Sequence, residues 1–171
     1  MKIRCLGILV CLLAAASLFA AGGNANLQPI AGSWKCTGIA FANEMGPEHP
    51  TQATVNTAWI LNDKWLRVDY KEMKTAKNAH PVAAELLMTY NEAEKKIASG
   101  CIDNMGGYCT ETSGTPPWDG DKLVLDGNSN MGGHAMKARE TFTKGKGWIK
   151  HMGETEMNGK WVKTDEETCK K

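Results

Sequence analysis

The chain has 171 residues, and 20 basic and 19 acidic residues give it a formal net charge of +1. Without a leader of residues 1–25, argued below, 146 residues remain (171 minus 25) and the net charge is 18 minus 19, or −1. This charge balance offers no field that attracts nucleic acid or an anionic membrane, and the length suits one domain with its own core.

The first predicted element is a secretory signal peptide over residues 1–25. Two basic residues precede an apolar run, Leu6 to Ala21, and small residues follow it, Gly23-Asn24-Ala25. The run is shorter than the roughly 20 residues that span a membrane, and its end fits cleavage after Ala25. We therefore expect a mature domain over residues 26–171 that has no membrane span and is periplasmic or secreted.

The mature chain is predicted to be almost entirely β-structure. After one short helical turn around residues 27–31, runs rich in β-branched and aromatic residues alternate with turn residues. Two-residue turns are expected at Asn62-Asp63, Gly145-Lys146 and Asn158-Gly159. Ten strands in sequence favour one antiparallel up-and-down β-barrel, since closure removes exposed sheet edges, with a two-sheet sandwich as the alternative. The predicted strands are Ser33–Phe41, Thr51–Leu61, Lys64–Met73, Ala83–Tyr90, Lys95–Asp103, Tyr108–Ser113, Lys122–Asp126, His134–Thr143, Gly147–Met157 and Lys160–Cys169.

Four cysteines remain after the leader is removed, and in an oxidising compartment an even number suggests two disulfides. Three pairings exist. Cys101 and Cys109 flank five residues symmetrically, as a cross-strand pair in a hairpin would, and this leaves Cys36 to join Cys169. The second bond would tie the first strand to the last. No Cys-x-x-Cys occurs, so zinc-ribbon or thioredoxin-like chemistry has little support.

The segment from Leu27 to Trp34 resembles the entry of a lipocalin-type barrel, in which a short helical turn precedes a Gly-x-Trp motif on the first strand. Three further stretches make the chain resemble a bacterial family of lipocalin-like domains, domain of unknown function 1579. The resemblance implies a calycin-like barrel and brings no catalytic residues. In lipocalins a basic residue of a late strand packs over this Trp, but neither mature arginine, Arg67 or Arg139, lies on the last predicted strand. The three stretches are residues 59–66, 102–106 and 118–123.

Side-chain alternation separates inner from outer positions on the late strands. With the turns given above, Glu140 faces His151 across one strand pair, and His151 faces Glu166 across the next. The resulting group of two carboxylates and one imidazole is interpreted as an anchor for a ligand head group, a metal site or an acid–base pair. A hydrogen-bonded cluster near a barrel mouth, without further function, is the alternative. The same bookkeeping predicts that Met136, Phe142, Ile149, Met157 and Val162 point inward, with Phe142 opposite Ile149 and Met136 opposite Thr155.

The favoured function is the binding of a small, largely apolar molecule in the barrel lumen. A packed barrel that acts as an envelope interaction module, through Pro116-Pro117-Trp118 and Trp65, is the first alternative. A metal-binding or hydrolytic site at Glu140, His151 and Glu166 is the second. No known catalytic motif occurs and the Met- and His-containing stretch at 131–136 fits no fixed ligand scheme, so neither catalytic residues nor a cofactor are assigned. The predicted ligand-binding residues are Trp59, Tyr70, Met88, Met136, Glu140, Phe142, Ile149, His151 and Glu166.

Overall fold

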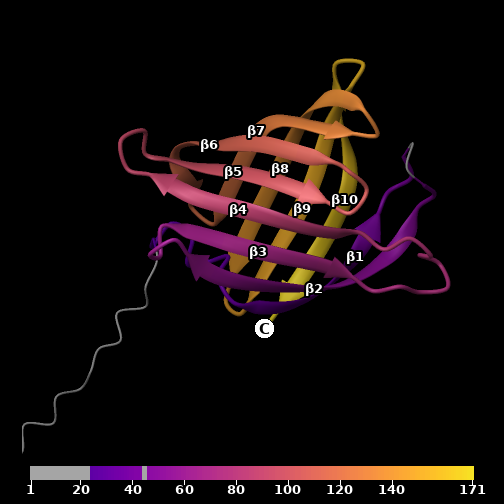
Figure 1. The fold of residues 1–171 in the computed structure, drawn as a ribbon, viewed down its shortest axis with the longest axis horizontal. Helices are drawn as coiled ribbons and strands as arrows, with labels where there is room; N and C mark the ends of the chain where they lie inside the picture. The colour runs from indigo at the N-terminus through magenta and orange to yellow at the C-terminus, as the bar shows by residue number, and fades with distance from the viewer. Residues whose placement is uncertain (1–23, 44–45) are drawn as a thin grey trace, which may run out of the picture.

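The computed structural model describes residues 24–43 and 46–171 and contains all ten predicted strands (Figure 1). Each strand pairs antiparallel with its chain neighbours, and β1 also pairs with β10, so the sheet closes into a barrel. The predicted up-and-down barrel is confirmed. In Figure 1, β2–β5 cross the front of the barrel at a steep angle to β8–β10 behind them. The strands are β1 (Ser33–Ala40), β2 (His49–Ile60), β3 (Trp65–Glu72), β4 (Ala83–Asn91), β5 (Lys96–Asp103), β6 (Tyr108–Asp119), β7 (Lys122–Met131), β8 (His134–Gly145), β9 (Trp148–Met157) and β10 (Lys160–Lys170).

The predicted signal peptide falls on residues 1–23 and two of the described residues, so its structure lies largely outside the described part of the chain. Among the described residues, no helix is long and apolar enough to cross a membrane. The segment before β1 forms consecutive turns over residues 25–30 in place of a regular helix.

Two strands, β6 and β7, extend well beyond their predicted ends. The prediction ended β6 at Ser113, but the strand continues to Asp119 through an irregular section between Ser113 and Trp118 that holds two prolines. Proline lacks a backbone N–H, so these residues fit a part of the strand without regular ladder pairing. The polar end of β7, residues 127–131, pairs with β8, which the local composition did not indicate.

Both predicted disulfides form. Cys36 on β1 lies directly opposite Cys169 on β10, and Cys101 on β5 lies directly opposite Cys109 on β6. The first bond crosses the seam where the barrel closes. Two disulfides fit an oxidising compartment.

The segment before β1 closes one end of the barrel, which we call the floor. Leu27 and Ile30 are buried against the apolar core at this end. The indole Nε1 of Trp34 donates a hydrogen bond to the Ile30 carbonyl oxygen (2.9 Å), and that of Trp118 donates to the Asn26 carbonyl oxygen (2.7 Å). The basic group that packs over the Trp of the Gly-x-Trp motif is Lys171, whose Nζ lies 4.7 Å from the ring centre of Trp34.

Replacing Leu27 with Ala should lower the free energy of unfolding by about 2–5 kcal/mol, because this side chain is completely buried in the floor. Ile102→Ala is the control, since Ile102 is 61% exposed and its truncation should change stability by less than about 0.5 kcal/mol. Urea denaturation followed by tryptophan fluorescence measures both. Equal small effects in the two variants would show that the floor segment is not part of the cooperative fold.

Candidate functional site

A cavity of about 360 Å³ lies inside the barrel between the floor and the opposite end. A volume of this size is in the range that holds small molecules. The lining at the opposite end, which we call the mouth, comes from the connections and strand ends near Pro47, His80, Met105 and Met131. Apolar side chains form most of the deeper wall, from Val55, Val68, Leu86, Met88, Phe142 and Ile149.

Most of the ionisable side chains that line the cavity are carboxyl groups. The lining includes many carboxyl side chains and three histidines, and among the described residues it contains no lysine and no arginine. The arginines lie elsewhere: Arg67 pairs with Asp69, and Arg139 pairs with Asp126 and packs over Trp161. The acidic lining residues are Glu72, Asp103, Glu111, Glu140, Glu154, Asp165 and Glu167, and the histidines are His49, His80 and His151.

The register between β8 and β9 differs from the prediction by two residues. The turn consists of Lys146 and Gly147, and Gly147 has a φ of +77°, a conformation that glycine adopts without strain. His151 therefore lies opposite Phe142, and their ring centres are 5.1 Å apart, whereas the predicted partner was Glu140. A shift of two residues keeps every side chain on its predicted face, because the side-chain period of a strand is two. Glu140 remains close enough to pair with His151 Nε2.

The predicted position of Glu166 is wrong because β10 contains an irregularity between Lys163 and Asp165. One extra residue at a bulge turns all later side chains to the opposite face. Glu166 therefore points away from the lumen and pairs with Lys150 (2.7 Å) and Lys163 (2.8 Å). Asp165 and Glu167 take the inward positions.

His151 is held between two carboxyl groups from different strands. Its Nδ1 lies 3.0 Å from an Asp165 carboxylate oxygen, and its Nε2 pairs with Glu140. Burial lowers the pKa of His151, but Glu140 and Asp165 outweigh burial and hold that pKa well above its ordinary value. Burial raises the pKa of Asp165, but His151 outweighs it and keeps that pKa low. The pair is therefore an imidazolium and a carboxylate at neutral pH.

A glycine leaves the room that this arrangement needs. Gly153 on β9 lies opposite both Glu140 on β8 and Asp165 on β10. A Cβ atom at this position would lie 2.5 Å from Asp165 Oδ1 and 2.6 Å from Thr164 Oγ1. The carboxylate of Asp165 can reach His151 because this side chain is missing.

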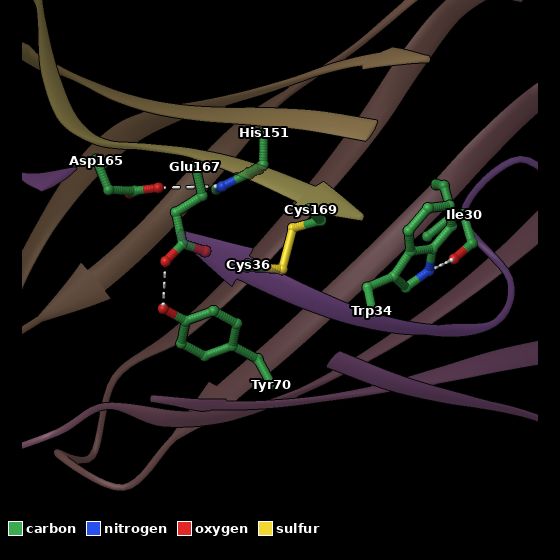
Figure 2. Close-up of a disulfide and its surroundings, with 8 residues drawn as sticks. All are labelled: Ile30, Trp34, Cys36, Tyr70, His151, Asp165, Glu167 and Cys169. Carbon is green, nitrogen blue, oxygen red and sulfur yellow. Dashed lines mark hydrogen bonds and ion pairs between the residues drawn. A yellow bond between two sulfur atoms is a disulfide. The ribbon is translucent and has the colours of Figure 1, made fainter. Parts of the chain in front are cut away.

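A second polar contact lies next to the seam disulfide. Tyr70 on β3 donates a hydrogen bond to Glu167 (3.1 Å), and Figure 2 shows both side chains turned toward each other beside His151. Burial raises the pKa of Glu167, and burial together with Glu167 raises that of Tyr70, so the phenol keeps its proton and donates. The disulfide of Cys36 and Cys169 lies between this polar cluster and Trp34 of the floor (Figure 2).

Glu111 on β6 is the lining residue that the sequence interpretation missed. Its side chain is 3% exposed, and neither carboxyl oxygen has a hydrogen-bond partner among the described residues. It lies between Ser99 on β5 and Gly127 on β7. Burial, and secondarily Glu140, raise the pKa of Glu111 to about 8. Glu111 lies two residues after Cys109, and side chains two residues apart on a strand point to the same face. The predicted bond between Cys101 and Cys109 would therefore have placed Glu111 on the face that carries this disulfide.

Most of the predicted ligand-binding residues reach the cavity. Tyr70, Met88, Glu140, Phe142, Ile149 and His151 line it. Trp59 packs against the core and Met136 is half-buried, but neither lines the cavity. Met157 and Val162 were expected inside and are about two-fifths exposed, because they lie at or beyond the pair of Ala138 and Thr155, where the pairing of β8 with β9 ends.

The positions of the relevant side chains give little support to the two alternative functions, an interaction module and a metal site. Trp65 and Trp118 are half-buried, so they form no exposed aromatic patch of the kind that the interaction-module hypothesis used. In the described residues, the group of side chains spaced as metal ligands is Cys36, Glu167 and Cys169, and its two cysteines are joined as a disulfide. Disulfide sulfurs are not the thiolates that bind metal ions.

Residues 23–170 match the sequence profile of a family described as "protein of unknown function (DUF1579)". No curated protein matches the chain.

Proposed function

We propose that this barrel, which belongs to the DUF1579 family, binds a small, largely apolar molecule in its lumen. The description of the family assigns no activity, so the proposal is argued from the cavity. The observation that carries this proposal is a cavity of about 360 Å³ with an apolar wall and a few inward polar groups. Small-molecule sites have this composition, since apolar contact supplies affinity and a few polar groups set orientation.

The floor and the mouth support the same function. Buried side chains of residues 27–34 seal one end, so a ligand would enter between the connections at the mouth. We also propose that the protein works in the periplasm or outside the cell, where its two disulfides would persist.

A neutral apolar fluorophore, N-phenyl-1-naphthylamine, should bind the purified mature protein with a stoichiometry near one, as measured by fluorescence titration. Ala84→Phe should weaken this binding by about tenfold or more, equivalent to about 1.4 kcal/mol, because Ala84 lines the cavity and the larger ring fills part of it. Ala135→Phe is the matched control, since Ala135 is exposed and does not line the cavity.

The proposal fails if the fluorophore does not bind, or if the two Phe variants bind it equally well. Native mass spectrometry of the protein purified from its own compartment would then show which molecule, if any, it carries.

A further inference from the structure

The cavity carries a charge asymmetry that an apolar ligand alone does not explain. Carboxyl groups project into it from β3, β6, β8 and β10, and no lysine or arginine of the described residues lines it. Burying a carboxyl group without a partner is unfavourable, so such groups are normally paired.

Most of these carboxyl groups have partners within the protein. Glu72 accepts a hydrogen bond from the Val82 backbone N–H (2.9 Å) and lies 3.7 Å from His49. Asp165 and Glu140 share His151, and Glu167 accepts from Tyr70.

Glu111 is the exception. Both of its carboxyl oxygens are buried without a hydrogen-bond partner, and so is the hydroxyl oxygen of Ser99, which lies directly opposite on β5. Ser99 in turn lies opposite Met88 on β4, part of the apolar wall. The lumen therefore presents the two unpaired carboxyl oxygens of Glu111 beside an apolar wall.

We propose that the ligand is an organic cation, an apolar molecule that carries a protonated amine, and that Glu111 binds its ammonium group. This inference rests on the proposed lumenal binding. An ammonium group has three donors and no acceptor, which complements the two unpaired Glu111 oxygens. The apolar body would lie along Met88, Leu86 and Phe142.

A metal ion fits these groups less well. Both ring nitrogens of His151 already pair with carboxyl groups, and Glu111 belongs to no group of described side chains with the spacing of metal ligands. A single carboxylate next to a hydroxyl is a weak site for a divalent ion but a sufficient one for an ammonium group.

Binding of an amine should strengthen as the pH rises toward about 8. The uncharged Ser99 and Gly127 flank Glu111, while Glu140 and Asp126 oppose its ionisation and His151 favours it. The free protein holds a proton on Glu111 below about pH 8, and an ammonium ion must displace this proton. Affinity should therefore increase by up to about tenfold per pH unit between pH 6 and pH 8.

The test compares three eight-carbon ligands with different head groups, n-octylamine, 1-octanol and octanoate, by isothermal titration calorimetry at pH 7.5. We expect octylamine to bind at least about tenfold more tightly than octanol, and octanoate to bind most weakly. Glu111→Gln should remove most of the preference for the amine over octanol. Glu166→Gln is the matched control, because this carboxylate lies outside the lumen and should not affect either ligand.

The outcomes separate this inference from the proposed function. If octanol and the neutral fluorophore bind but octylamine binds no more tightly, the ammonium site is overturned and the apolar cavity stands. If none of them binds, both proposals fail. Persistence of the amine preference in Glu111→Gln, or displacement of octylamine by equimolar Zn²⁺, would also overturn the assignment of an ammonium site at Glu111. The pH dependence in the wild-type protein tests the same inference without a variant.

Discussion

Replacing Cys36 and Cys169 together with alanine should lower the free energy of unfolding by about 5 kcal/mol, because this disulfide closes a very long loop. The two cysteines are 133 residues apart in the sequence. A cross-link of this length removes much of the conformational freedom of the unfolded chain, and the unfolded state becomes less favourable. Urea denaturation of the oxidised protein, monitored by circular dichroism, measures the loss.

The second disulfide provides the control for this experiment. Cys101 and Cys109 are only 8 residues apart, so the same chain-entropy argument gives a loss of about 2.5 kcal/mol when both become alanine. Both pairs join directly opposed residues of neighbouring strands, so loop length is the main difference between them. Equal losses would show that local packing, and not chain entropy, determines what the disulfides contribute.

Glu111→Gln should make the ligand-free protein more stable at neutral pH, although it removes a group that we propose binds ligand. The pKa of Glu111 in the folded state is about 8, against 4.5 for an ordinary glutamate. A folded-state pKa above the unfolded one means that stability is full below about pH 4.5 and falls as the pH rises toward 8. From pH 4.5 to pH 7 this one group should cost about 3 kcal/mol, and glutamine, which does not ionise, avoids the cost.

Unfolding by urea at pH 4.5 and pH 7.5 tests this expectation. The two proteins should be similar at the lower pH and should diverge at the higher one. Glu166→Gln should behave in the opposite way, because hydrogen bonds from Lys150 and Lys163 lower the pKa of Glu166 and its contribution is lost as the pH falls. If Glu111→Gln is less stable than the wild type at pH 7.5, Glu111 has a partner that stabilises its charged form.

These expectations for Glu111 connect stability with binding. The buried carboxyl group lowers the free energy of unfolding of the empty barrel, and a ligand that pairs with it restores this free energy. The stability of the protein then depends on that ligand. Sites built for binding commonly reduce stability in this way.

The sequence predicted the barrel well because its strands and turns carry local signals. The turn predicted at Asn62-Asp63 implies a β2–β3 register with Trp59 opposite Leu66, and the structure has this register. At the β8–β9 turn two adjacent pairs, Gly145-Lys146 and Lys146-Gly147, both include a glycine, and the positive φ of Gly147 decides between them. The residue types at this turn do not determine which of the two glycines has the positive φ.

The candidate site was less predictable because it depends on contacts between distant strands. The bulge next to Thr164 exchanges Glu166 for Asp165 and Glu167, and no residue type at this point marks a bulge. Glu111 lies on the face that the predicted Cys101–Cys109 pair already implied, but the assignment of inner and outer positions was not extended to this strand. The resemblance to lipocalins did not predict Lys171 over Trp34, because this residue follows the last predicted strand and is not an arginine.

The pairing of β1 with β10 also sets the order of events during folding. The first strand has no second neighbour until the last strand has left the ribosome or the export channel, because every other pairing is between consecutive strands. Until then both edges of the growing sheet stay open, and open edges are where chains associate wrongly. Closure of the sheet and formation of the bond between Cys36 and Cys169 must therefore both wait for β10, so these steps follow the pairing of the consecutive strands.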